Sequence, residues 1–337
     1  MSIYSNFVNV SPSVNTALEV LRNTQLKLGV TQRQMSSGLR VQNAQDNATY
    51  WTIATTTRSD IGAVSAVQDS LGLAAATVNV ASTGMNSAID IVSEIKSKLV
   101  SASEASVDKS KVNDELTALK AQLRSTADSA SFNGVNWIVL DGDEDPTMPH
   151  QIPGSFIRGP DGSVSVGMLN YEGVSSTSGP ITTDDARYLV DDQASNGGGY
   201  GVLTSTAFAT AAGASQNYVL LSSENGDTSG QVEISLDANT TSGQLDDMVS
   251  TVDAMLKQMI KVGSAFGSLE SRVQLQTDFA SSFSDSLTSG VGKLVDANME
   301  QQSSKLLALQ TQQQLGTQSL SIANASMQVV QQLFQNL

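Results

Sequence analysis

The residue types that most often do chemistry are scarce in this chain. It has no cysteine and a single histidine, His150. Because transition metals are bound mainly by those two residue types, a metal site at His150 would need carboxylates alone as its other ligands. His150 stands among prolines and aspartates, and we expect it to be a solvent-exposed loop residue. Trp51 and Trp137 are expected to pack against neighbouring side chains rather than to stack on a ligand.

Two short segments look like binding loops in composition only. Residues 141–145 read Asp-Gly-Asp-Glu-Asp, but Pro146 stands where a calcium loop needs glycine, and Ile152 where it needs glutamate. Residues 196–201 are glycine-rich, but neither Lys-Ser/Thr nor a helix start follows, as a phosphate-binding loop requires. No His-Glu-x-x-His run of a zinc peptidase occurs. We interpret the first segment as an acidic turn and residues 194–201 as a flexible connection, and predict no catalytic residue, metal site or cofactor.

The charge balance excludes several classes of partner. The 337 residues carry a net charge of −15. Nucleic acids and anionic membrane surfaces attract clustered cations, so neither is an expected partner. The first residues lack the basic and apolar regions of a standard secretory signal peptide, so export would need another route. No apolar run approaches the roughly 20 residues of a membrane span, and we expect no membrane insertion.

Composition changes along the chain and predicts the fold class. All ten lysines lie outside residues 141–242, whereas five of the six prolines fall between Pro146 and Pro180. The outer segments are rich in Ala, Gln, Ser, Val and Leu and show helical periodicity. We predict a mainly α fold: a long helical coiled coil or bundle built from both termini, with a small β-rich central insertion.

The N-terminal segment has the period of a coiled coil. Small or apolar residues recur in alternating steps of three and four from Ile3 to Met35, which is a 3.5-residue period. A helix is expected to start at Ser11-Pro12 and to end at Ser36-Ser37-Gly38. A second long stripe repeats every seven residues from Tyr50 to Leu99, and a shorter helix carries Val112 to Ala127.

The middle of the chain shows turns and short strands. Ser131-Phe132-Asn133-Gly134 is a turn signal before a strand-like run at 135–140. Residues 217–222 and 231–236 form the clearest pair of strands. Helical periodicity then returns from Leu245 and continues nearly to Leu337.

The last 32 residues, 306–337, contain no charged side chain. As a helix they would be about 48 Å long. A solvated helix normally carries many charges, whereas Gln, Ser, Thr and Asn suit a helix contacted by protein on several sides. Pairing of the two termini would bury one side of each helix, so the other sides predict extensive homo-oligomerisation. The alternative is a polar tail that stays disordered.

The two ends resemble those of bacterial flagellins. Residues 34–54, Gln-Met-Ser-Ser-Gly-Leu-Arg-Val-Gln-Asn-Ala-Gln-Asp-Asn-Ala-Thr-Tyr-Trp-Thr-Ile-Ala, are similar to the family's N-terminal signature. Residues 294–300, then Leu306-Leu307, the run 313–316 and Ala323-Asn324, resemble its C-terminal helix. The version with Asn47 and Tyr50 looks like flagellins of soil alpha-proteobacteria such as rhizobia.

The resemblance implies a domain plan and a set of partners. Residues 1–35 with 299–337 would form an inner coiled-coil domain, 36–142 with 243–298 a helical core domain with a β-hairpin, and 143–242 a variable, solvent-exposed outer domain. The chain would be a non-enzymatic structural subunit, secreted through the flagellar type III apparatus, that polymerises alone or with sister flagellins. Hook-associated proteins, cap proteins and an export chaperone would be its partners.

Subunit packing and the link between domains are assigned to named residues. The packing residues are expected on the apolar stripes of both ends: Ile3, Phe7, Val10, Val14, Leu21, Leu28, Leu306, Leu309, Leu320, Met327, Val330, Phe334 and Leu337. The inter-domain link, where the resemblance places adjustment between filament states, is Ser36, Ser37, Gly38, Arg40 and Asp46.

Three rival functions remain open on the sequence. A hook–filament junction protein shares the same end helices, although residues 34–54 favour flagellin. An enzyme carried on a helical frame would need a pocket of convergent titratable groups, which the scarcity of histidine and cysteine disfavours. An intracellular coiled-coil scaffold is the third.

Overall fold

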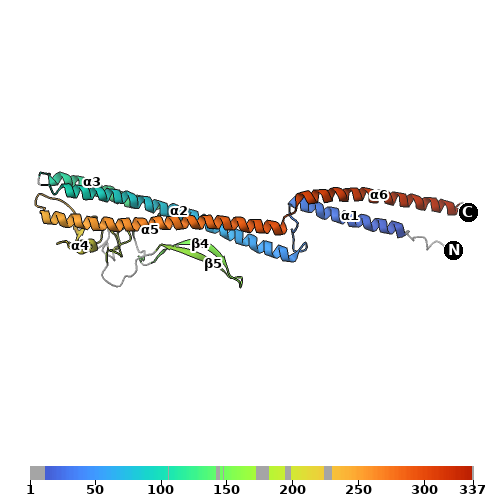
Figure 1. The fold of residues 1–337 in the computed structure, drawn as a ribbon, viewed down its shortest axis with the longest axis horizontal. Coiled ribbons are helices and arrows are strands. Elements are labelled where there is room, and N and C mark those ends of the chain that lie inside the picture. Colours follow the sequence, from blue (N-terminus) through green and yellow to red (C-terminus); the bar gives the residue numbers. More distant parts are fainter. Residues whose placement is uncertain are drawn as a thin grey trace. The chain divides into compact units, whose positions relative to one another are not determined.

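A computed structural model describes residues 12–104, 106–141, 145–146, 148–171, 182–193, 199–223 and 230–335. Five long helices dominate: α1 (Pro12–Ser37), α2 (Ala48–Ser101), α3 (Lys109–Ser129), α5 (Ser242–Val295) and α6 (Met299–Gln335) (Figure 1). The chain divides into two compact units, residues 1–62 with 284–337 and residues 63–283, so α2 and α5 contribute to both. The predicted mainly α fold with a small strand-containing insertion is confirmed.

In the first unit, residues 1–62 with 284–337, which we call the terminal unit, α1 lies along α6 (Figure 1). Val14, Thr24 and Thr31 of α1 and Leu309 of α6 are buried on the facing sides. The two threonines can be buried because each hydroxyl donates to a carbonyl one turn earlier, at 2.8 and 2.9 Å. Polar residues in the predicted stripe therefore do not interrupt the pairing.

Glycines serve the terminal unit in two ways. Gly316 brings α6 close to α1, because a Cβ at this position would lie 3.1 Å from Leu21 Cδ1. Gly38 follows the last residue of α1 with φ of +70°, a left-handed conformation that ends helices and favours glycine. The predicted end of the first helix at 36–38 is confirmed.

The second unit, residues 63–283, has one hydrophobic core shared by α2, α3 and α5. The seven-residue stripe of α2 is fully buried from Leu71 to Leu99. On α5, every third or fourth residue from Leu245 to Val273 is buried, as the periodicity predicted. Helix α3 starts at an N-cap, Asp108, whose carboxylate accepts a bond from the Ser110 amide.

Side chains from the middle of the chain enter the same core. They come from the short helix α4 (Ala207–Ala212), which the sequence did not predict, and from the segments around it. The fully buried ones include Leu189, Val190, Val202, Leu203, Phe208 and Leu220. The expectation of a flexible connection at 194–201 is wrong for its described end, because Tyr200 is only 3% exposed; residues 194–198 lie outside the described part.

The strands form four two-stranded sheets among the described residues. β1 (Ser131–Phe132) and β2 (Val135–Asn136) form a hairpin around the turn predicted at 131–134, with Asn133 and Gly134 both at positive φ, as a type I′ hairpin turn requires. The strand predicted over 135–140 is interrupted. Asn136 explains this, because its side-chain oxygen accepts bonds from the amides of Ile138 and Val139 in place of a strand partner.

After the interruption, β3 (Val139–Leu140) pairs in parallel with β6 (Val190–Asp191). The pair expected at 217–222 and 231–236 is also present, as β7 (Tyr218–Val219) and β8 (Val232–Glu233), but it is short and parallel. A parallel pair needs a crossover of about a dozen residues rather than a tight turn.

The longest strands, β4 (His150–Arg158) and β5 (Val164–Tyr171), form an antiparallel hairpin. His150 is therefore not the solvent-exposed loop residue that we expected. It begins β4 and stacks on Trp137 with ring centroids 4.7 Å apart. The expectation failed because the local Pro/Asp composition carries no information about a tryptophan that tertiary folding brings alongside. Trp137 itself is 7% exposed and packs as predicted.

Candidate assembly surface and link

The predicted link is fastened to the connection between α5 and α6. The amides of Arg40 and Val41 donate to the Val295 carbonyl, at 2.6 and 3.2 Å, and the Ala297 amide donates to the Gly38 carbonyl at 2.8 Å. The Arg40 guanidinium adds a bond to the Leu294 carbonyl at 2.8 Å. Two chain segments more than 250 residues apart thus form one hydrogen-bonded joint.

Two further link residues shape the segment between α1 and α2. The Asp46 carboxylate accepts bonds from the backbone amides of Asn43 and Gln42, at 3.0 and 2.9 Å, and these bonds hold its pKa below the usual value. The Ser37 hydroxyl accepts from the Leu39 amide at 3.2 Å. Ser36 is exposed. Short-range hydrogen bonds between polar side chains and the backbone thus shape the link.

The predicted packing residues within the described part lie on the seam between α1 and α6. Val14 and Leu309 are buried, and the others are half-buried: Leu21, Leu28, Leu306 and Leu320. These side chains join two helices of one chain. Ile3, Phe7, Val10 and Leu337 lie outside the described residues, as do the side chains of Met327, Val330 and Phe334. The assignment of all thirteen to contacts between subunits stays a prediction.

The outward faces of the same helices carry a second apolar set that we did not predict. On α6, Leu315, Ile322 and Val329 follow one another every seven residues, and they are 59%, 71% and 63% exposed. Leu307 is also exposed, as are Val20 and Leu26 on α1. A second heptad series beside the seam was visible in the sequence and could have identified them.

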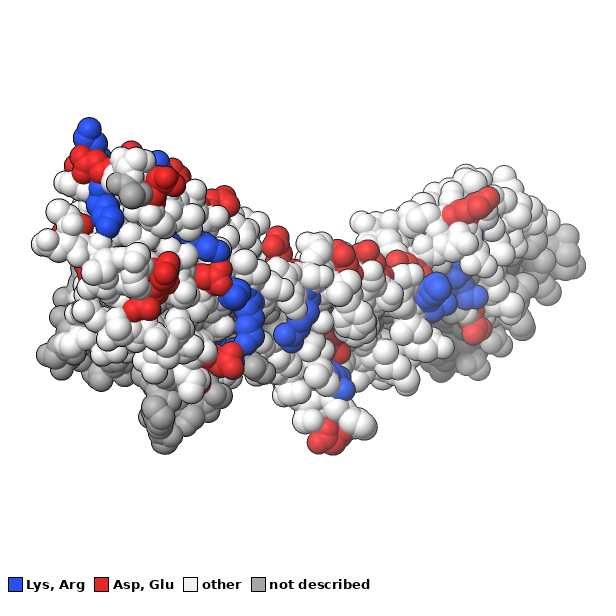
Figure 2. Space-filling view, turned by 60° about the vertical axis from the view of Figure 1, so that its left-hand side comes forward, with Lys and Arg blue, Asp and Glu red and all other residues white. Residues whose placement is uncertain are grey.

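A groove of about 930 Å³ runs between α1 and α6. It is lined by Ala17, Val20, Thr24, Lys27, Leu315 and Gly316, among others. Figure 2 shows wide uncoloured areas between small groups of charges on the face it presents. The groove has a mixed lining, because Asn23, Gln312 and Ser319 lie in it beside Val20 and Leu315. The exposed apolar side chains Val20 and Leu315 are not covered by the described part of the chain.

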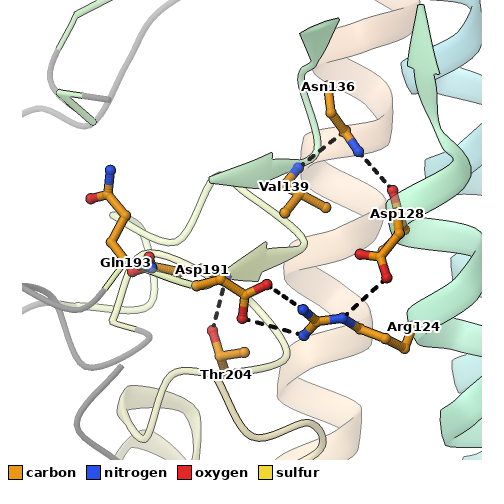
Figure 3. Close-up of polar contacts among 9 residues, drawn as sticks. Arg124, Asp128, Asn136, Val139, Asp191, Gln193 and Thr204 are labelled. Atoms are coloured by element: carbon orange, nitrogen blue, oxygen red, sulfur yellow. Dashed lines mark hydrogen bonds and ion pairs between the residues drawn. The ribbon is translucent and has the colours of Figure 1, made fainter. Parts of the chain in front are cut away.

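The most deeply buried charges lie in the second unit and have structural partners. Arg124 of α3 reaches the segment that follows β6 (Figure 3) and pairs with the Asp192 carboxylate at 2.5 Å. It also contacts Asp128 at 3.3 Å. The Asp191 carboxylate accepts from the amides of Gln193 and Tyr200, and burial raises its pKa. These groups attach the middle segment to α3.

Other kinds of site find little support in the described residues. Among them, no group of three or more His, Cys, Asp or Glu side chains could hold a metal ion.

One helix, α2, is long and apolar enough to cross a membrane by length and composition, with a most apolar window of mean hydropathy 1.3. The expectation that no apolar run approaches the length of a membrane span is therefore wrong for α2, by length and composition. Only 22% of the window is buried, which leaves apolar helix surface exposed in the single chain.

Comparison with known proteins agrees with the resemblance of the two ends. Residues 8–143 match the bacterial flagellin N-terminal helical region, and residues 249–334 match the C-terminal helical region. Flagellin C of Rhizobium meliloti is 43% identical over 97% of this chain and 99% of its own length. Flagellin A of Rhizobium meliloti is 38% identical, over 96% and 98%, and a flagellin of Brucella melitensis is 35% identical, over 96% of each chain. The chain therefore belongs to the bacterial flagellins, the structural subunits of the flagellar filament.

Proposed function

We propose that copies of this chain polymerise through the outward apolar faces of α1 and α6 into a filament that serves swimming motility. The observation that carries this proposal is that α6 has two sets of apolar residues, one buried against α1 and one exposed. Its seam, with Leu309 6% exposed, is occupied by α1 of the same chain, while Leu315, Ile322 and Val329 remain more than half exposed. Burial of each of these three side chains would contribute about 1–2 kcal/mol.

The absence of charge makes the same face suited to burial on several sides. From Leu306 onward every polar side chain is an amide or a hydroxyl. Such groups can be satisfied by neighbouring protein at lower desolvation cost than charged groups. The groove beside Val20 and Leu315 offers a place for a third helix, which a neighbouring copy would supply.

The domain plan follows from this proposal. Residues 1–35 with 299–337 would form the innermost layer, residues 36–142 with 243–298 the next, and residues 143–242 the outward-facing part. The link from Ser36 to Asp46 would then join the two inner layers. Its hydrogen bonds to Val295 and Ala297 are the contacts that a change between filament states would rearrange.

Export and partners are part of the same proposal. The subunit would leave the cell by flagellar type III export, with a chaperone that covers its apolar ends. Sister flagellins, hook-associated proteins and cap proteins would be its neighbours in the flagellum. We further propose that the chain has no catalytic activity, which accords with a family of structural proteins.

The experiment compares two substitutions on α6. Ile322→Lys places a charge at a 71% exposed position that assembly would bury, and burial of an unpaired charge is costly. Ser304→Lys is the matched control, because this exposed residue lies beside Lys305 in the charged first turns. We expect both monomers to fold equally, and only Ile322→Lys to fail to elongate filament seeds under the electron microscope. Normal filaments from Ile322→Lys would contradict the proposed surface.

The hook–filament junction alternative predicts a different behaviour of the unmodified protein. A filament subunit elongates seeds without limit, whereas a junction protein stops after one ring. Wild-type monomer that binds seeds but never elongates them would favour the junction protein.

A further inference from the structure

Aromatic rings surround the single histidine at the open end of the β4–β5 hairpin. His150 lies parallel to Trp137, with centroids 4.7 Å apart and planes 7° apart. Its cross-strand partner Tyr171 lies at 6.3 Å and 17°, and Tyr188 meets it edge-on at 6.4 Å. Tyr171 in turn stacks on Phe266 of α5 at 4.8 Å. The stack thus connects both strands of the hairpin to α5 and to Trp137.

The position of the hairpin depends mainly on this end. Among the described residues β4 and β5 pair only with each other, so no strand pairing fixes the hairpin to the rest of the unit. Ile152 and Tyr171, near the open end, are 2% and 9% exposed. Towards the tip, Val164 and Val166 are 57% and 46% exposed. The attachment therefore lies towards the open end, where Tyr171 of the aromatic stack and Ile152 belong to the core and Phe156 and Leu169 pack against it.

The stack accommodates neutral imidazole better than imidazolium. His150 Nε2 is buried without a hydrogen-bond partner in the described structure, and burial lowers the pKa of the ring. Within the described part of the chain, the titratable groups that meet its ring are Tyr171 and Tyr188, with the Arg187 cation acting on Tyr171; Trp137 and Phe266 contribute none. Ring faces attract a cation, but imidazolium here would lose its hydration and gain no carboxylate among these neighbours.

We propose that His150 is a pH-sensitive latch: neutral, it completes the stack and holds the hairpin on α5, and protonated, it releases the open end of the hairpin. The latch is independent of the polymerisation proposed above and operates in the single chain.

The direction of the pH effect follows from linkage. The docked hairpin binds fewer protons than the released one below the ordinary histidine pKa of about 6.5. Docking is therefore strongest above that pH. Below it, the equilibrium constant for docking falls by up to about ten-fold for each pH unit, until the docked histidine itself becomes protonated.

Two features of the sequence make the test specific. Because the chain has one histidine, a ¹³C-histidine NMR titration of the full-length monomer reports His150 alone. Because it has two tryptophans, Trp51→Phe leaves Trp137 as the only emitter, and Trp51 is itself partly exposed on the other unit. From pH 8 to 4 we expect a His150 midpoint below 6.5 and a parallel red shift of Trp137 emission. A midpoint at or above 6.5 would overturn the latch.

A conservative variant separates the latch from general acid unfolding. His150→Phe keeps a ring in the stack but cannot be protonated. With intrinsic rates corrected for pH, hydrogen exchange of the peptides covering 150–171 should be faster at pH 5 than at pH 7.5 in the wild type, by up to about 30-fold. In His150→Phe it should be unchanged, while the peptides of α2 stay protected in both. Equal acceleration in the variant would show that histidine is not the trigger.

Discussion

Leu307 and Leu309 lie two residues apart on α6 and have opposite surroundings. Leu309 is 6% exposed against α1, whereas Leu307 is 62% exposed. Truncation of a buried leucine to alanine costs about 2–5 kcal/mol in a large core. A pair of helices can close around the gap, so we expect about 2 kcal/mol for Leu309→Ala. That loss lowers the equilibrium constant for pairing of α1 with α6 about 30-fold.

Leu307→Ala should leave the monomer unchanged and affect only assembly. Surface substitutions usually change stability by less than about 0.5 kcal/mol. If Leu307 packs on a neighbouring copy, loss of about 1 kcal/mol of burial raises the critical concentration for elongation about five-fold.

The assay has two parts, carried out on both variants. Thermal unfolding of the monomer followed by far-ultraviolet circular dichroism reports the helix pair, and the residual monomer concentration at the end of seeded growth reports assembly. Two results would refute the reasoning: an unchanged helix-pair transition in Leu309→Ala, or equal loss of monomer stability in both variants.

Three further predictions concern the second unit. In Gly84→Ala the new Cβ would lie 2.6 Å from Ala130 Cβ, so we expect a net loss of about 1–2 kcal/mol and a fall in Tm of about 3–6 °C by calorimetry. Asp192→Asn removes the 2.5 Å ion pair of Arg124, which keeps its 3.3 Å contact with Asp128, and should cost about 1.5–3 kcal/mol in urea unfolding. Hydrogen bonds from two lysines hold the pKa of Asp253 below its ordinary value. The ionised Asp253 therefore stabilises the fold fully above about pH 4, and this stabilisation is lost as the pH falls further. The stability of an Asp253→Asn variant should decline less steeply in an acid titration.

Helix positions and core residues could be predicted because their period is local. The α2 stripe is buried from Leu71 to Leu99 and the α5 stripe from Leu245 to Val273, although Tyr50 at the start of the α2 stripe is 39% exposed. Helix α1 ends at Ser37, as predicted. Because the repeat extends over many helical turns, single polar residues such as Thr24 do not obscure it. The β-rich middle was predicted only in outline, because the partner of β3 is far away in the sequence and the β4–β5 hairpin packs on residues of distant segments.

Which apolar face meets which partner could not be read from one helix. The stripe through Leu309 was assigned to contacts between subunits, yet within the described part it faces α1 of the same chain. We overlooked the exposed series through Ile322, because the stripe through Leu309 already accounted for the helical periodicity. A periodic pattern shows that a face is buried, but it does not say by what.

The sequence by itself determined the class of the molecule: two periodic ends, a helix without charge and the 34–54 signature were sufficient for fold and family. Only the tertiary structure decided the surroundings of single residues. His150 is the clearest case, since its neighbours Trp137, Tyr171 and Tyr188 come from three separate segments. The physical reason is that helical periodicity is fixed by neighbours within a few residues, whereas burial and protonation depend on contacts that the folded chain alone creates.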